Sequence, residues 1–317
     1  MPYTGWVADG IGYIRHSDFT EGCYEDMRAA VEKLRTGGEL KGLILDYRSN
    51  GGGIMQEAIK ILGMFVPKGT EVVSTKGRTE DSRQVYRTSS EPILPDLPLA
   101  VLINGNSASA SEIVTGALQD LDRAVVIGQR SYGKGLVQSP RPLGYNAMLK
   151  LTTAKYYIPS GRCIQAIDYS HSQEGSVKAI PDSLITEYRT RAGRKVYDGG
   201  GIMPDLFVPL DTTEMTPYYM EVAGRNILYR YTMEYADRNR EKINAVESIA
   251  QLDSLLDADT GMFDDFVRYA ERNGVAPDRR QIRQSERLLR ALLRAYIGRN
   301  TPLEETGFYA NYYVVDA

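Results

Sequence analysis

Three serines stand at alternate positions in the segment NGNSASASEIVTG, and serine is a common nucleophile in covalent catalysis. The middle one, Ser109, lies three residues before Glu112 and ahead of an apolar run with helical spacing. This Ser-x-x-Glu pattern predicts a capping box at the start of a helix, which is an ordinary structural role. The position also suits a nucleophile, because the free N–H groups of a helix's first turn can stabilise an oxyanion. The residue that would accept the serine proton therefore decides between the two interpretations.

Histidine is the usual proton acceptor for a serine, and the sequence contains only two. His16 lies in IGYIRHSDF beside a predicted strand, and His171 lies in the polar stretch DYSHSQEG. Sequence spacing links neither of them to Ser109, and each is better explained as a structural or surface residue. Lys134 is the stronger candidate, although a lone loop lysine is normally a solvated charge. It lies between two glycines in RSYGKGLVQ, and glycines permit backbone geometry that turns this side chain inward.

A lysine must lose its proton before it can act as a base. At an ordinary lysine pKa near 10.4, only about one amine in two thousand is neutral at pH 7. Burial disfavours the ammonium form, so we expect Lys134 to be desolvated. Gln138 could orient the amine without adding the negative charge of a carboxylate. Four residues of straight strand span about 13 Å, so contact between Lys134 and Gln138 requires the chain to turn near residues 133–135.

A longer segment around these residues, NSASASEIVTGALQDLDRAVVIGQRSYGKGLVQ, resembles the active-site region of the carboxyl-terminal processing peptidases, also called tail-specific proteases. Members of that family are serine endopeptidases that use a Ser-Lys dyad on a crotonase-like (ClpP-like) α/β core. Further similar stretches are GIGYIRHSDF and LKGLILDYRSNGGG upstream, and LKLTTAKYYIPSGRCIQ and GGGIMPD downstream. The resemblance covers most of residues 10–210.

The resemblance implies a role for each matching side chain near the serines. Ser109 corresponds to the nucleophile, Lys134 to the general base, and Gln138 to the residue that positions the lysine in many members. Ser107 and Ser111 are then left with structural roles. The implied substrates are protein or peptide chains, bound in extended form near their C-termini and cleaved through an acyl-enzyme.

The resemblance also implies an oxyanion hole and a supporting aspartate. The expected oxyanion donors are the N–H groups of Ala110 and Gly52. Asp120 matches an aspartate that supports the site, although a contact at a helix end explains it equally well. The glycines around Gly52 do not form a P-loop, because no Gly-Lys-Ser/Thr sequence closes the stretch. No metal or cofactor is implied.

The elements that carry these residues predict an α/β fold. The apolar stretches KGLILDY, LPLAVLING and RAVVIG predict buried strands, and MLKLTTAKYYI predicts a longer extended piece. The stretches TEGCYEDMRAAVEKLRTGG and MQEAIKILGMF, with residues 110–121, predict amphipathic helices. Such alternation is typical of strands joined by right-handed crossover helices, here a crotonase/ClpP-like core over residues 1–210.

Beyond residue 210 the pattern is helical, which predicts an α-helical C-terminal region over residues 211–317 whose function the sequence does not assign. Its last helical stretch carries arginines at spacings of three and four, namely Arg280, Arg283, Arg287, Arg290 and Arg294. An arginine stripe could bind phosphate groups. A solvated face that pairs with local acids is the better explanation, because no aromatic residues interleave with the arginines.

Composition limits the remaining possibilities. The net charge of -3 at pH 7 gives no general attraction to nucleic acid or to anionic membranes. The sequence has no apolar run long enough to span a bilayer. Cys23 and Cys163 are far apart in the sequence, so neither a disulfide framework nor a cysteine-based zinc site is indicated.

Two features depart from the usual family pattern. Members commonly carry a PDZ domain that binds the substrate tail, whereas only about 40 residues precede the LILDY strand here, too few for such a module. In addition, residues 166–197 form an insertion that we expect to cover or border the cleft. Two alternative functions therefore stay open: a catalytically silent module that binds peptide tails, and a crotonase-like enzyme that acts on acyl thioesters. The family implies work outside the cytoplasm, in the periplasm or cell envelope, and the sequence does not indicate an oligomeric state.

Overall fold

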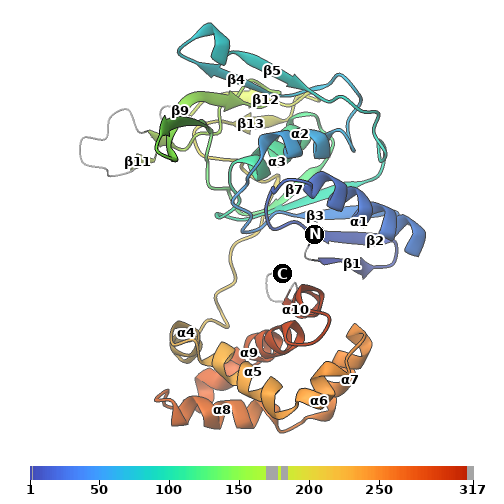
Figure 1. The fold of residues 1–317 in the computed structure, drawn as a ribbon, viewed down its shortest axis with the longest axis vertical. Helices are drawn as coiled ribbons and strands as arrows, with labels where there is room; N and C mark the ends of the chain where they lie inside the picture. Colours follow the sequence, from blue (N-terminus) through green and yellow to red (C-terminus); the bar gives the residue numbers. More distant parts are fainter. Residues whose placement is uncertain (2, 169–177, 180–184, 313–317) are drawn as a thin grey trace. The chain divides into compact units, whose positions relative to one another are not determined.

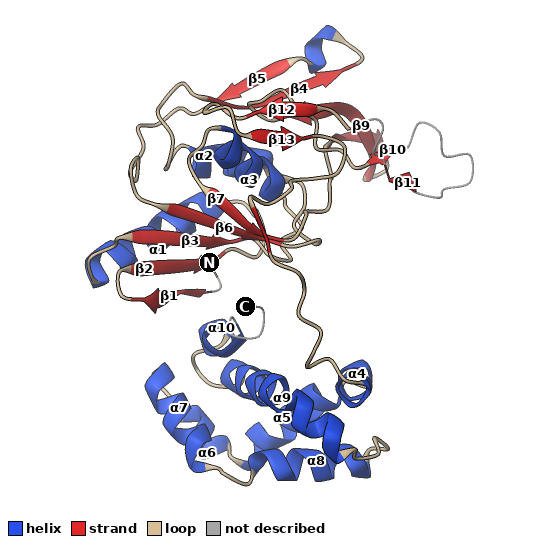
Figure 2. Ribbon diagram, turned by 180° about the vertical axis from the view of Figure 1, so that it is seen from behind, coloured by secondary structure: helices blue, strands red, loops and turns tan. Residues whose placement is uncertain are grey.

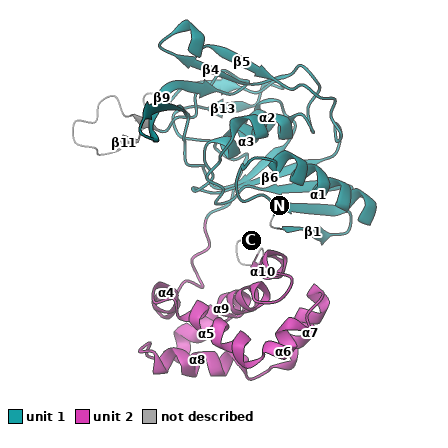
Figure 3. Cartoon of the chain, in the orientation of Figure 1, with its two compact units in different colours: residues 1, 3–209 teal, residues 2, 210–317 magenta. Residues whose placement is uncertain are grey.

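The computed structural model describes residues 1, 3–168, 178–179 and 185–312. The chain forms two compact units, residues 3–209 and residues 210–317 (Figures 1 and 3). Each unit has its own apolar core. The mixed α/β fold followed by a helical region, which the sequence predicted, is confirmed.

A six-stranded sheet runs through the first unit (Figure 2). Its strands in spatial order are β1 (Tyr3–Ala8), β2 (Ile11–Arg15), β3 (Gly42–Asp46), β6 (Leu99–Ile103), β7 (Val125–Gly128) and β14 (Leu206–Phe207). β1 is antiparallel to β2, and the other neighbouring strands are parallel. The sheet therefore begins earlier than expected, because the residues counted as preceding the first core strand already contribute β1 and β2.

Three helices cross between the parallel strands: α1 (Cys23–Gly37), α2 (Met55–Leu62) and α3 (Ala110–Asp120). α1 buries one apolar face at helical spacing. α3 is different, since all of its residues are buried. Figures 1 and 2 show the reason, because α2 and α3 lie between the six-stranded sheet and a second sheet. Gly116 permits this packing, since a Cβ there would lie 2.6 Å from Ile158 Cδ1 and 2.8 Å from Ile202 Cδ1.

The second sheet has four antiparallel strands in the order β5 (Gln84–Arg87), β4 (Glu71–Gly77), β9 (Ala147–Tyr157) and β8 (Leu136–Gly144). A 3-10 turn, η1 (Glu80–Ser82), connects β4 to β5. β8 is an edge strand that the sequence pattern missed, because prolines interrupt its alternation. Two small pairs complete the unit: β10 (Ile167–Asp168) with β11 (Lys178–Ala179), and β12 (Glu187–Arg189) with β13 (Lys195–Tyr197).

The described part of the second unit contains α4 (Pro217–Gly224), α5 (Ile227–Arg238), α6 (Arg240–Asn244), α7 (Ile249–Ala258), α8 (Met262–Arg272), α9 (Arg279–Arg299) and α10 (Glu305–Tyr312). α4 and α5 are separate helices, because Asn226 between them adopts a φ of 57°. None of the described helices is long and apolar enough to cross a membrane.

The arginines of α9 behave largely as a solvated face. Arg287 pairs with Glu214, and Arg290 pairs with Glu286 on its own helix. Arg294 contacts two acids of α7 at 2.6 Å each. The interpretation that these side chains pair with local acids is confirmed for these three.

Candidate active site

Ser109 is the N-cap residue of α3, at the end of the turn that follows β6. Its φ of 59° and ψ of -116° are rare for a residue with a side chain. Backbone strain of this kind persists only where the surroundings hold it, and it is frequent at functional sites. Ser109 is partly exposed, whereas its neighbours Ala108 and Ala110 are buried. The start of α3 thus presents this one hydroxyl at the positive end of the helix dipole.

The two flanking serines have structural roles, as expected. Ser107 Oγ donates to the carbonyl oxygen of Tyr47 at 2.8 Å, and Ser111 Oγ donates to that of Asn50 at 3.0 Å. Both serines are fully buried. They fix the loop that follows β3 against α3 and are inaccessible to a substrate.

Glu112 connects the candidate nucleophile to the candidate base. Its carboxylate is only 1% exposed and accepts four hydrogen bonds. Oε2 accepts from the backbone N–H groups of Ser109, at 2.8 Å, and Lys134, at 2.9 Å. Oε1 accepts from Ser131 Oγ at 2.5 Å and from the N–H of Gly133 at 2.7 Å. Burial raises the pKa of Glu112, while the four donated hydrogen bonds favour its ionised form and oppose that rise.

Tyr156 on β9 joins the same two residues from the other side. Its hydroxyl donates to the carbonyl oxygen of Lys134 and lies 3.2 Å from that of Ser109. Burial raises the pKa of Tyr156 well above its ordinary value, so the ring remains a neutral phenol that can donate. A buried carboxyl group and a buried hydroxyl therefore both connect the main chains of Ser109 and Lys134.

Backbone hydrogen bonds and close packing hold the loop around Lys134. Besides the contacts with Glu112 and Tyr156, the carbonyl of Gly133 accepts from the N–H of Ala166 at 2.9 Å. Gly135 donates its N–H to Gln165 Oε1 at 2.7 Å. A Cβ on Gly133 would lie 2.3 Å from Ala166 Cβ, so this glycine is needed for close packing. Lys134 itself is partly buried.

The sequence-predicted contacts of the lysine side chain are not formed as hydrogen bonds. Within the described residues, none joins the Lys134 amine to the Ser109 hydroxyl or to Gln138. Residues 133–135 are not straight strand, because Gly133 has a φ of 86° and β8 begins only at Leu136. Gln138 is exposed, next to a register shift in the pairing of β8 with β9. Its role stays a prediction.

Gly52 packs directly against the start of α3. Its φ is 92°, and a Cβ there would lie 2.7 Å from Ser109 Cβ and 2.8 Å from the Ala110 nitrogen. Only glycine permits this approach. The N–H of Gly52, however, donates to Asn50 Oδ1 at 2.8 Å. The N–H of Ala110 belongs to the first turn of α3, where backbone donors have no acceptor within the helix. Ala110 can therefore bind an oxyanion directly, whereas Gly52 can do so only after Asn50 releases it.

Asp46 anchors the loop that carries Gly52, and sequence reasoning missed it. It is fully buried at the end of β3 and pairs with Arg15 at 2.7 Å and Arg48 at 2.8 Å, while Tyr13 donates its hydroxyl to the same carboxylate. Burial raises the pKa of Asp46, but hydrogen bonds and charge from Arg48 and Arg15 hold it below its ordinary value. The loop thus starts from a fixed, ionised residue.

The histidines offer no base in the described part of the chain. His16 is buried between Phe19 and Tyr47, with ring centroids 4.3 Å and 5.3 Å away. Burial lowers its pKa to about 4, so it is neutral at pH 7. His16 is therefore a core residue, as its sequence context predicted. His171 lies outside the described residues.

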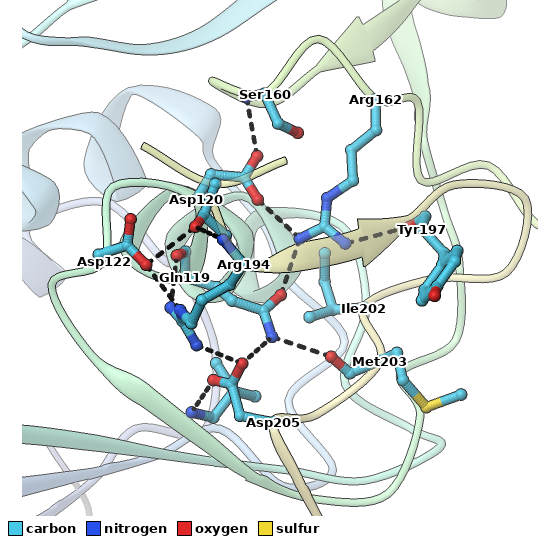
Figure 4. A network of polar contacts seen from close by, with 12 residues as sticks. Gln119, Asp120, Asp122, Ser160, Arg162, Arg194, Tyr197, Ile202, Met203 and Asp205 are labelled. Atoms are coloured by element: carbon cyan, nitrogen blue, oxygen red, sulfur yellow. Dashed lines mark hydrogen bonds and ion pairs between the residues drawn. The ribbon is translucent and has the colours of Figure 1, made fainter. Parts of the chain in front are cut away.

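Asp120 lies at the opposite end of α3, about 16 Å from Ser109 along the helix axis. It pairs with Arg162 at 2.8 Å, accepts from the N–H of Ser160 at 2.9 Å, and is buried together with Arg162 (Figure 4). Gln119 accepts from the same guanidinium at 2.7 Å. These contacts attach the segment after β9 to the end of α3, so any support that Asp120 gives to the site is exerted through the helix.

The β12–β13 part of the insertion contacts the same end of α3. Arg194, in the turn between β12 and β13, pairs with Asp122 at 2.6 Å and with Asp205 at 2.5 Å (Figure 4). It also donates to the carbonyl oxygen of Gln119 at 2.9 Å. Arg194 therefore lies away from Ser109, whereas Ala166, at the start of the insertion, contacts Gly133 beside Lys134. That the insertion covers or borders the cleft stays a prediction. Residues 169–177 and 180–184 of the insertion lie outside the described residues.

Comparison with known proteins identifies the family. The model of peptidase family S41 matches residues 10–171, a range that contains Ser109 and Lys134. This chain belongs to peptidase family S41. A second family model, "Family of unknown function (DUF8443)", matches residues 218–301 of the helical unit. The resemblance stated from the sequence is confirmed.

Carboxyl-terminal processing proteases are similar to about half of this chain. It is 47% identical over 164 residues to a carboxy-terminal-processing protease of Bartonella bacilliformis, covering 51% of this chain and 38% of that protein. It is 41% identical over 177 residues to a carboxyl-terminal-processing protease of Synechocystis, covering 56% of this chain and 38% of that protein. The solved photosystem II D1 C-terminal processing protease aligns at 26% identity with a TM-score of 0.48, over 64% of this chain and 43% of that one. The chain thus spans well under half the length of these relatives.

Proposed function

We propose that this chain is the catalytic part of a carboxyl-terminal processing serine endopeptidase that works through a Ser109–Lys134 dyad. The observation that supports this most directly is the shared carboxylate of Glu112, which accepts from the backbone N–H groups of both residues. A capping box alone needs no contact with a second loop. Holding a strained serine beside a rigid lysine loop is what a catalytic pair requires.

The proposed reaction assigns one step to each group. The Lys134 amine, in its neutral form, takes the proton from Ser109 Oγ as that oxygen attacks the peptide carbonyl. The N–H of Ala110 stabilises the oxyanion, and the N–H of Gly52 joins it once Asn50 Oδ1 withdraws. The amine then protonates the leaving group and later activates the water that hydrolyses the acyl-enzyme. Gln138 is proposed to orient the lysine without adding charge.

The proposed substrates are protein chains bound in extended form, with cleavage near the C-terminus. β8 leaves the Lys134 loop as an edge strand, so its free edge can pair with an added strand. Pro140 and Pro142 lack N–H groups, which leaves the inner half of β8, Leu136 to Ser139, as the better surface for pairing. Peptides with a free apolar C-terminus should be cleaved faster than the same peptides with an amidated end.

The dyad is tested by digestion of an unfolded protein with the wild-type chain, Ser109→Ala and Lys134→Ala. Each substitution should lower the rate of cleavage by about a thousandfold or more, because loss of either the nucleophile or its base removes nearly all of the effect of the pair. Lys155→Ala is the matched control, because Lys155 is exposed on β9 and should leave the rate unchanged. Proteolysis that survives Ser109→Ala would contradict the mechanism. Tail-peptide binding by a wild-type chain that cuts nothing would favour a silent binding module instead.

We also propose that the protein works outside the cytoplasm, as the family resemblance implies. Cell fractionation with an antibody against the helical unit tests this, and recovery only in the cytoplasmic fraction would contradict it.

A further inference from the structure

The hairpin of β8 and β9 ends in three large apolar side chains that are mostly exposed within the described residues. Tyr145 is 107% exposed, Leu143 is 63% exposed and Met148 is 61% exposed. We call these three residues the apolar tip. Tyr145 has a φ of 49°, a conformation that glycine or asparagine adopts at much lower cost than tyrosine. Neither packing nor turn geometry therefore explains an aromatic residue at this place.

Two cations lie directly behind the apolar tip. Arg141 pairs with Leu149 across the hairpin, and Lys150 pairs with Pro140. Cross-strand partners share a face and successive residues alternate, so Arg141 and Lys150 project from opposite faces of the hairpin. Both are exposed, and within the described residues neither forms an ion pair. We call these two residues the basic collar.

The collar belongs to a segment with an unusual charge distribution. No Asp or Glu occurs between Arg123 and Ile167, although the whole chain has a net charge of -3. The β8–β9 hairpin, which we call the arm, is thus a local positive projection on an acidic protein. It attracts an anionic partner that the average charge would repel.

We propose that the apolar tip and the basic collar dock this protein on the surface of an anionic lipid bilayer. Gly144 at the turn lies three positions after Arg141 along the strand, a rise of about 10 Å. That length matches the roughly 5–10 Å to which interfacial apolar groups enter the boundary between headgroups and acyl chains. Tyrosine is enriched at that depth, and cations just behind it contact lipid phosphates.

The shape and chemistry of the arm favour a bilayer over a polypeptide. Side chains at the end of a two-stranded turn form a convex surface, whereas small ligands and peptides are usually bound in concave sites. The outer part of β8 contains Pro140 and Pro142, which cannot donate backbone hydrogen bonds to an added strand. A fluid bilayer requires neither a groove nor backbone pairing.

The test is sedimentation of the full chain with vesicles of phosphatidylcholine, with or without phosphatidylglycerol. The wild-type chain should pellet with the anionic vesicles, and less so at high salt. The triple variant Leu143→Ser/Tyr145→Ser/Met148→Ser should bind about a hundredfold more weakly or worse, because it removes the buried apolar area. Val85→Ser is the matched control, since Val85 is 54% exposed on β5 of the same sheet, away from the apolar tip. This variant should bind vesicles as the wild type does.

The collar is tested separately. Arg141→Gln/Lys150→Gln should weaken binding roughly 25-fold, at about fivefold for each cation lost near an anionic surface. Lys33→Gln/Lys68→Gln removes the same charge from exposed positions elsewhere and should bind as the wild type does. Unchanged near-ultraviolet circular dichroism will show that all four variants are folded.

Two results would overturn the proposal. One is a wild-type chain that pellets no better with anionic vesicles than without them. The other is a triple tip variant that binds vesicles as the wild type does. If the tip variant instead slows cleavage of a soluble unfolded protein while no chain binds vesicles, the arm binds polypeptide and the lipid assignment is wrong.

Discussion

Replacement of Glu112 by glutamine tests whether one buried charge positions the dyad. The carboxylate accepts from Ser109 and Lys134 through Oε2, and from Ser131 and Gly133 through Oε1. A glutamine side chain has one oxygen and one NH₂ group. Whichever way it is placed, its NH₂ group faces donors that the carboxylate had satisfied. If the oxygen keeps Ser109 and Lys134, the N–H of Gly133 loses its acceptor.

The size of the effect follows from these contacts. A buried N–H left without a partner costs about 1–3 kcal/mol, and each remaining hydrogen bond that loses its charge weakens by about 1 kcal/mol. Relief of the buried charge offsets part of this loss, so Glu112→Gln should lower the free energy of unfolding by roughly 2–5 kcal/mol. A displacement of Lys134 relative to Ser109 by about 1 Å should lower kcat/KM about a hundredfold.

The assay compares kcat/KM at a temperature where each variant is folded, with stability measured by denaturant unfolding. Glu57→Gln is the matched control, because Glu57 is a second buried glutamate, on α2, that has no contact with the dyad. Its carboxylate accepts from the N–H of Tyr24 at 2.9 Å. It should lower stability and leave kcat/KM unchanged. The reasoning is refuted if Glu112→Gln keeps wild-type kcat/KM, or loses no more of it than Glu57→Gln does.

Three further predictions concern stability. His16 has a pKa of about 4 in the folded chain and about 6.5 when unfolded. The free energy of unfolding should therefore fall by roughly 3 kcal/mol as the pH drops from 7 to 4. For His16→Phe, the plot of this free energy against pH should lack that fall. Gly307→Ala places a Cβ 2.4 Å from the carbonyl oxygen of Gly298 and should destabilise the helical unit by about 1–3 kcal/mol. Thermal unfolding measures this effect. An unchanged midpoint would show that α10 is not tightly packed on α9. Asp120→Asn leaves the Arg162 charge buried without its partner and should lower the free energy of unfolding by about 3–5 kcal/mol. The double variant Asp120→Leu/Arg162→Met should recover much of that stability. A double variant no more stable than the single one would contradict this reasoning.

The parts of the fold that sequence predicted are those with local signals. β3, β6 and β7 are continuous apolar runs, and α3 begins at a capping box, so each can be recognised within about ten residues. β8 gave no such signal, because it is an edge strand with prolines and exposed side chains on both faces. The positive charge of the β8–β9 hairpin was also not predicted, because the net charge is a sum over the whole chain.

The candidate site shows the same division. Ser109 and Lys134 lie in short motifs and could be proposed from sequence. Glu112 was visible only as a capping partner, because its contacts with the Lys134 loop depend on how α3 packs against residues 131–135. Asp46 gave no signal that distinguished it from any residue at a strand end. The Gly52–Asn50 hydrogen bond is likewise a tertiary detail, as it depends on how the loop after β3 turns.

The long-range contacts of Glu112 and Tyr156 have a consequence for a newly made chain. Ser109 becomes fixed relative to Lys134 only after α3, residues 131–135 and β9 have all assembled, since each supplies part of the two connections. An incompletely folded chain therefore has the serine and the lysine but not their alignment. Under the proposed mechanism, a newly made chain would therefore cleave other chains only after these three parts have assembled.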